Sequence, residues 1–303
     1  MALPQLLQWV NGQLLGLFPT QMGGNTTYAQ NVVALNSAGF VDPSMLSLQL
    51  EGGDARAKFL ASQILDGGNA STVYGVVPYA QVILQDQPVA YWPLNETAGA
   101  VANDLSGNGY NAAYIGTPTL GAAPIAPGLG ASVSLNGSTQ YVELATPPAA
   151  LQLVEGSFEG WWLPSVIPTA ANTGGAVVAA VYNSSNVNYM LGFGANDGST
   201  SHSNFSFGHY GAAWTSATNS TAATANTPAH LVATFNGTTM ILYVNGVSVA
   251  SVAASTFTPT ANGIVMGAGD NGGYLTGLLS NVAIYNTVLS AARIQAHYNA
   301  GIA

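Results

Sequence analysis

The sequence predicts a mainly β protein, with an all-β sandwich or barrel over residues 86–303 and a small mixed, partly helical arm over residues 1–85. After Gln85, short β-branched and aromatic runs alternate with turn residues, as in sandwiches and barrels. Before Gln85, the chain combines helical periodicity with glycine pairs and prolines and offers few core residues. The arm therefore looks too thin to fold as an independent domain.

The expected strands are apolar runs bounded by Gly, Asn, Ser and Pro. In chain order they cover residues 132–135, 141–144, 157–163, 176–182, 189–193, 204–208, 230–235, 240–244, 247–252, 264–267 and 278–285. Asn236-Gly237 and Asn245-Gly246 tolerate positive φ and predict three consecutive antiparallel strands. Ser290 is expected to cap a closing helix that covers a sheet edge or corner.

In the arm, leucine and valine recur at spacings of four and three and predict an amphipathic helix over residues 3–18. A second helical phrase covers residues 55–65. Two heptads fit either ordinary packing or a self-associating bundle. Because the arm buries little of its own surface, we expect it to dock on a partner or to oligomerise.

Charge and composition exclude several classes of partner. The chain has twelve acidic residues but only three basic ones, Arg56, Lys58 and Arg293, too few to neutralise phosphates or anionic headgroups. We therefore expect no nucleic-acid and no membrane partner. The N-terminus lacks the basic region of a secretory signal, and no apolar run approaches the ~20 residues of a membrane span.

The sequence does not predict an enzyme. Retaining glycoside hydrolysis needs two carboxyl groups ~5–5.5 Å apart. The nearest pair in a strand region, Glu155 and Glu159, would lie ~13 Å apart in an extended strand. No histidine has a G-x-S-x-G serine nearby, and His230, at the start of a strand, is expected to be structural.

Five ordered phrases carry a resemblance to a known fold. They are AYWPLNETAGAVANDLSGNGYNA at 90–112, SVSLNGSTQYVEL at 132–144, SFEGWW at 157–162, the hairpins at 230–251, and GLLSNVAIYNTVLSAARIQAHYNAG at 277–301. Together they resemble laminin-G-like domains of the concanavalin A-like jelly-roll superfamily, over about residues 89–301. The resemblance implies a jelly-roll β-sandwich, a fold that serves lectins, adhesion modules and glycanases alike.

The same resemblance implies a possible calcium site at Glu96, Asp104 and Asn108. Asp104 matches the acidic residue of the family's D-x-S-G-N-G loop, and Glu96 matches that of its Y-W-x-L-x-E phrase. The late family phrase I-D-E-V reads Leu-Ser-Asn-Val at 279–282, so two acidic groups are missing. In the alternative, Asp104 and Asn108 only satisfy backbone groups of a tight loop.

Asn186, Tyr210, Trp214 and Tyr274 are the candidate glycan-binding residues, because aromatic faces stack on sugar rings and amides bond their edges. They fall in regions that read as loops. Trp92, Trp161 and Trp162 lie in strand phrases and are expected in the core. Since neighbouring strand residues face opposite ways, either Trp161 or Trp162 must leave the inner core or lie under a neighbouring subunit.

A shorter resemblance lies in the arm, where VALNSAGFVDPSML at residues 33–46 is similar to a phrase of bacteriophage head-fibre and capsid-decoration proteins. It implies a virion structural protein, a capsid decoration or a head or tail fibre. Residues 1–85 would bind a major capsid or tail protein and form a homo-oligomer, with a trimer favoured. The sandwich, on the virion exterior, would stabilise the shell or adhere to a host-surface glycan. The alternative is a secreted or cell-surface carbohydrate-binding or adhesion module.

Overall fold

The computed structural model describes the backbone of residues 7–10, 13–22 and 25–33, and residues 78–168, 175–183, 186–193, 203–210, 214–254, 263–269 and 273–303. Side chains are described for residues 78–168, 175–183, 186–193, 203–210, 214–254, 263–269 and 273–303, except those of residues 180–183, 186–188 and 210. The chain divides into two compact units, residues 1–70 and residues 71–303.

The first unit contains a three-stranded antiparallel sheet of β1 (Leu7–Val10), β2 (Gln13–Met22) and β3 (Asn25–Val33). The helix expected over residues 3–18 is therefore wrong. Gly16 disfavours a helix, and pairing with β1 and β3 gives the backbone of β2 its hydrogen bonds. Residues 34–77, which hold most of the 33–46 phrase and the helical phrase at 55–65, lie outside the described residues.

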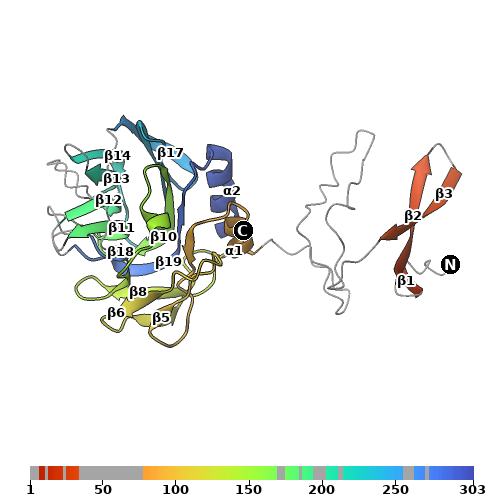
Figure 1. Ribbon diagram of the computed structural model, residues 1–303, viewed down its shortest axis with the longest axis horizontal. Coiled ribbons are helices and arrows are strands. Elements are labelled where there is room, and N and C mark those ends of the chain that lie inside the picture. Colours follow the sequence, from red (N-terminus) through yellow and green to blue (C-terminus); the bar gives the residue numbers. More distant parts are fainter. Residues whose placement is uncertain are drawn as a thin grey trace. The chain divides into compact units, whose positions relative to one another are not determined.

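The second unit is a sandwich of two eight-stranded antiparallel sheets (Figure 1). The first sheet runs β17-β16-β15-β10-β19-β8-β7, and β4 pairs with β19. Its strands are β4 (Ala90–Trp92), β7 (Thr119–Ala122), β8 (Ser132–Asn136), β10 (Gly156–Pro164), β15 (Ala229–Phe235), β16 (Thr239–Val244), β17 (Val247–Ala253) and β19 (Thr276–Tyr285).

The second sheet runs β14-β13-β12-β11-β18-β9-β6-β5. Its strands are β5 (Val101–Ala102), β6 (Ala112–Ile115), β9 (Tyr141–Leu144), β11 (Ala176–Asn183), β12 (Asn186–Phe193), β13 (Asn204–Tyr210), β14 (Trp214–Ala222) and β18 (Gly263–Met266). Every strand that the sequence predicts is present, and the jelly-roll β-sandwich is confirmed.

Turn chemistry fixes the hairpins as expected. Asn245 and Gly246 have φ of 52° and 81°, and Gly237 has φ of 86°. Asn residues tolerate this left-handed region better than most side chains, and Gly does so without steric cost. The two turns set β15, β16 and β17 side by side in antiparallel order.

The main core fills the space between the sheets. It contains Trp92, Phe158, Trp162, Phe193 and Phe207, each at most 1% exposed. Trp162 packs edge-on against Phe193, with ring centroids 4.4 Å apart. This packing fixes the end of β10 relative to the end of β12.

Two helices cover the outer face of the first sheet, α1 (Tyr79–Leu84) and α2 (Ala291–Gly301) (Figure 1). Ser290 caps α2 as expected, because its hydroxyl accepts a hydrogen bond from the Arg293 backbone. A short 3₁₀ helix, Ala149–Leu151, precedes β10. Within the described residues no helix is long and apolar enough to cross a membrane.

Trp161 lies beneath these helices and not in the inter-sheet core. It is 1% exposed, its indole N–H donates to the Tyr79 hydroxyl at 2.9 Å, and its ring stacks on His230 and Tyr298. One tryptophan of the pair thus leaves the inner core, as expected, but helices of the same chain cover it and no neighbouring subunit is needed. Helix α1 accordingly packs as part of the sandwich, although the sequence places residues 1–85 in the arm.

Candidate functional site

One row of residues crosses the second sheet and defines its outer face. Neighbours in register are Ser216, Gly208, Met190, Ala179, Val265, Glu143 and Ala113, each on the next strand of the sheet. Met190 and Val265 alternate along their strands with Leu191 and Ile264 of the inter-sheet core. Because strand residues alternate between faces, the row points away from that core.

Three half-buried aromatic side chains, Tyr141, Trp214 and Tyr274, pack on this outer face. Their base is a buried cluster of mostly small residues, Ala176, Ala179, Met190, Val265 and Ala268. We call these three rings and their base the aromatic platform. It offers flat apolar surface with hydroxyl groups, which is the chemistry of sugar stacking.

Close backbone approach makes the platform flat at its Trp214 end. A Cβ on Gly208 would lie 2.4 Å from Cζ2 of the Trp214 ring, so the indole rests directly on the glycine of the neighbouring strand. At the other end, Tyr141 and Tyr274 have ring centroids 6.1 Å apart. Neighbouring strands lie ~4.8 Å apart, so the four strand spacings from Gly208 to Glu143 span ~19 Å. The platform can therefore contact an extended ligand.

Glu143 gives the platform its charge, because it faces outward two residues after Tyr141 on β9. Burial raises the pKa of the Tyr141 phenol, and Glu143 and Tyr274 raise it further. Tyr141 therefore stays neutral and can donate a hydrogen bond at neutral pH. The half-buried Glu143 carboxylate can accept hydrogen bonds from ligand hydroxyls.

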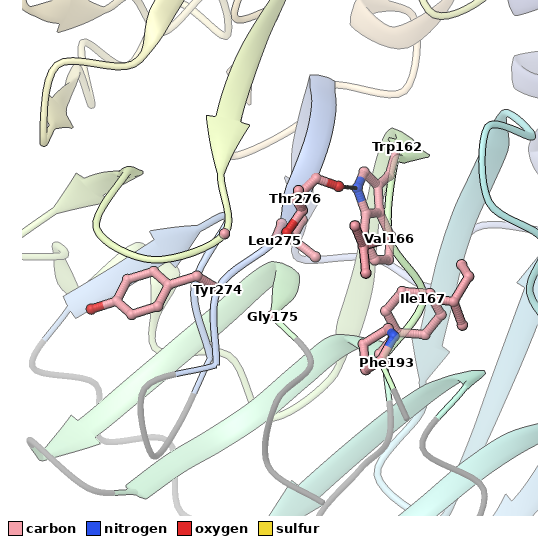
Figure 2. Close-up of a pocket in the computed structure, with 10 residues that line it drawn as sticks. Trp162, Val166, Ile167, Gly175, Phe193, Tyr274, Leu275 and Thr276 are labelled. Carbon is pink, nitrogen blue, oxygen red and sulfur yellow. Dashed lines mark hydrogen bonds between the residues drawn. The ribbon is translucent and has the colours of Figure 1, made fainter. Parts of the chain in front are cut away.

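A pocket of about 270 Å³ opens beside Tyr274, at the end of the sandwich (Figure 2). In Figure 2 the side chains of Trp162, Val166, Ile167 and Phe193 gather on one side, and Tyr274 lies on the other. The pocket falls just below the ~300–1,000 Å³ of ordinary small-molecule sites. Residues 169–174, between two lining segments, lie outside the described residues. We regard the pocket as an apolar margin of the platform.

Trp214 and Tyr274, predicted from the sequence as ligand-binding residues, thus pack against the same buried cluster. Asn186 and Tyr210 lie in β12 and β13 of the same sheet, but their side chains lie outside the described ones. The sequence reading placed Asn186, Tyr210 and Trp214 in loops, whereas each belongs to a strand.

Tyr141 and Glu143 were missed as site residues. The signal was present, because they alternate with buried Val142 and so must face away from the core.

The loop around Asp104 fastens β4 through hydrogen bonds. One carboxylate oxygen accepts the backbone N–H groups of Tyr91 and Ser106, and the other accepts the Ser106 hydroxyl and the Tyr110 backbone N–H. These contacts match the alternative in which Asp104 satisfies backbone groups of a tight loop.

Glu96 and Asn108, the other two predicted calcium ligands, make contacts of their own. Glu96 accepts hydrogen bonds from the Asn103 backbone and the Tyr114 hydroxyl, and the Asn108 amide donates to the Val89 carbonyl. Within the described residues, no group of three or more His, Cys, Asp or Glu side chains is arranged to hold a metal ion. Because calcium also takes amide and carbonyl oxygens, the calcium site stays a prediction.

A buried network joins the first sheet to the two helices. Glu159, fully buried on β10, accepts a hydrogen bond from the Tyr285 hydroxyl at 2.6 Å and contacts His297 Nδ1 at 2.9 Å. His297 Nε2 lies 2.7 Å from an Asp86 carboxylate oxygen. Asp86 also accepts hydrogen bonds from Nε and an NH₂ group of the Arg293 guanidinium. Both imidazole nitrogens face carboxylate oxygens, so the geometry favours the doubly protonated ring.

The charges of this network reinforce one another. Burial raises the pKa of Glu159, but the positive charge and hydrogen bond of His297, together with His230 Nε2 at 3.4 Å, outweigh it and hold that pKa well below its usual range. Burial lowers the pKa of His297, yet Glu159 and Asp86 raise it above its ordinary value. For His230, burial prevails and lowers the pKa. We call this network of Glu159, Tyr285, His297, Asp86 and Arg293 the clamp, because it joins β10 to α1 and α2. Its role is structural, as expected for the neighbouring His230.

A family model described as the concanavalin A-like lectin/glucanases superfamily matches residues 136–295. The match contains the second sheet from β9 onward and thus the whole platform. None of the curated proteins with which the sequence was compared matches it.

Solved structures share the fold. Domain 4 of AbnA, an extracellular arabinanase from Geobacillus stearothermophilus solved with arabinotriose, is 18% identical, with a TM-score of 0.55 over 70% of this chain and 98% of that one. The botulinum neurotoxin serotype D binding domain is 16% identical, with a TM-score of 0.53 over 71% and 52%. Trypanosoma rangeli sialidase is 13% identical, with a TM-score of 0.51 over 70% and 32%. This chain thus spans nearly all of the arabinanase domain but about half and a third of the other two chains.

Proposed function

Because this chain belongs to the concanavalin A-like lectin/glucanases superfamily, we propose that its second unit is a carbohydrate-binding or adhesion module that works outside the cell, secreted or at a surface. The observation that carries the proposal is the aromatic platform of Tyr141, Trp214 and Tyr274. Tyr141 and Trp214 belong to strands of the second sheet, Tyr274 pairs with Ala268 in an isolated β-bridge, and all three half-buried rings pack against the same buried cluster. Such a surface recognises sugar rings by stacking.

Two further features indicate that the platform binds a ligand rather than catalysing a reaction. Glu143 is the acidic side chain in the row across the sheet, whereas glycoside hydrolysis uses a pair of carboxyl groups. The bound arabinotriose in the similar arabinanase domain supports an oligosaccharide as the class of ligand. The ~19 Å between Gly208 and Glu143 suits a chain of sugar residues better than a single ring.

Replacing Trp214 with Ala is expected to weaken oligosaccharide binding by about 30-fold, the loss of one aromatic anchor worth about 2 kcal/mol. Isothermal titration with arabino-oligosaccharides, after a glycan array has identified the best ligand, measures the change. Gly208→Ala should also weaken binding, because the added Cβ would displace the Trp214 ring without removing it.

Val247→Ala is the matched control, because Val247 is 59% exposed on the edge of the other sheet. It should bind with the affinity of the unmodified protein. Equal affinities for Trp214→Ala, Gly208→Ala and Val247→Ala, with all three folded, would contradict a binding role for the platform.

A bacteriophage virion role for the whole chain rests on the phrase at residues 33–46. In this second proposal, residues 1–85 attach the protein to a capsid or tail, and the sandwich is displayed outward. A structural virion protein is present in a fixed copy number per particle. Mass spectrometry of purified, nuclease-treated particles from the source culture should then find the chain at constant stoichiometry to a major capsid protein. Its absence from the particles would contradict the virion role and leave the carbohydrate-binding or adhesion module as the remaining proposal.

A further inference from the structure

We propose that the aromatic platform selects neutral glycans and rejects those that carry carboxylate, sulfate or phosphate groups. This inference rests on the proposed function and specifies its ligand class. It follows from the placement of charge in the second unit, where the only outward carboxylate in the row across the platform is Glu143.

The sandwich supplies almost no positive charge. Residues 71–303 contain eight acidic residues and one basic residue, Arg293. Proteins bind anionic groups most strongly through arginine and lysine, which pair with carboxylate and phosphate oxygens. An acidic sugar would therefore lose hydration on binding without gaining an ionic partner.

Arg293 does not serve the platform. Its guanidinium bonds both oxygens of Asp86, at 2.9 and 2.7 Å to one oxygen and 3.0 Å to the other, and it also donates to the Val82 carbonyl. These partners lie at α1, on the outer face of the first sheet. The platform lies on the outer face of the second sheet.

Besides finding no cationic partner, an acidic glycan would be repelled by the negative charge of Glu143. Its neighbours in register on the two flanking strands, Val265 and Ala113, carry no charge. A ligand carboxylate or sulfate within a Debye length, about 8 Å at physiological salt, is repelled. Sugar hydroxyls, by contrast, can donate hydrogen bonds to the same oxygens. One residue thus favours neutral chains and disfavours acidic ones.

The test compares matched pairs of glycans on the full-length protein. Each neutral oligosaccharide is immobilised beside a form of the same chain that carries a sialic acid, a uronic acid or a sulfate group. We expect the neutral member to bind at least about 10-fold more tightly in low salt. Added salt should narrow the gap by screening. Glu143→Gln should also narrow the difference in affinity between the neutral and acidic members, and it should change affinity for the neutral member less than affinity for the acidic one.

Glu155→Gln is the control, since it removes an equal charge from an exposed position just before β10 in the other sheet. It should leave the gap unchanged. Equal or tighter binding of the acidic members would overturn this inference and leave glycan binding intact. Binding of neither class would overturn the proposed function, and this inference with it.

Discussion

Replacing Glu159 with Gln is expected to lower the melting temperature by roughly 10 °C. The substitution keeps the shape of the side chain but leaves His297 without its buried carboxylate partner. Removing one member of a buried ion pair costs about 3–5 kcal/mol. In a domain of this size each kcal/mol shifts the melting temperature by about 2–4 °C. Differential scanning calorimetry measures the shift.

The exposed Glu155 provides the matched control, because Glu155→Gln makes the same chemical change four residues earlier and should leave the melting temperature unchanged. The pH dependence gives a second test. His297 holds its proton more tightly when folded, so its contribution is complete below the ordinary histidine pKa of 6.5 and is lost as pH rises through the raised value. Glu159→Gln should therefore reduce the alkaline loss of stability. Equal melting temperatures for both variants would contradict the clamp.

Truncation before residue 86 is expected to destabilise the sandwich, whereas truncation before residue 78 is not. The shorter protein lacks Tyr79 and Ile83, whose burial contributes about 1.5–3 kcal/mol each. It also leaves the buried Trp161 indole N–H without its acceptor, at a cost of about 1–3 kcal/mol. We expect the 86–303 protein to melt at least about 10 °C below the 78–303 protein, or to fail to fold.

Ile83→Ala in the full chain tests the same packing without truncation, and should cost about 2–5 kcal/mol. The neighbouring Leu84, 36% exposed, offers the control substitution Leu84→Ala with a small effect. If the 86–303 and 78–303 proteins had equal melting temperatures, α1 would belong to the arm and not to the sandwich.

The sequence predicted the sandwich well because its strands carry strong local signals. Asn245-Gly246 and the apolar runs around it specify a hairpin almost without tertiary context. Strand β14, by contrast, was missed, because WTSATNSTA is largely polar and forms a half-exposed edge whose pairing with β13 supplies the stability. The helix expected over residues 3–18 failed for a similar reason, since partner strands override periodicity.

The candidate site was only partly predictable. Trp214 and Tyr274 are recognisable as aromatic residues in polar surroundings, but their neighbourhood depends on the order β14-β13-β12-β11-β18-β9, which no local pattern encodes. The clamp was less accessible still, because Glu159 and His297 are separated by 138 residues. Strand alternation alone shows that Glu159 shares a face with Trp161. It does not show that a helix covers that face.

The positions of α1 and α2 determine how the sandwich can be tethered. Both helices lie on the outer face of the first sheet, and α1 is the first helix of this unit. The aromatic platform occupies the opposite outer face. A support linked through α1 would therefore leave the platform unobstructed. Under the proposed glycan binding, copies held on one support would engage a polyvalent glycan together. Weak individual contacts would then add up to durable attachment through effective concentration.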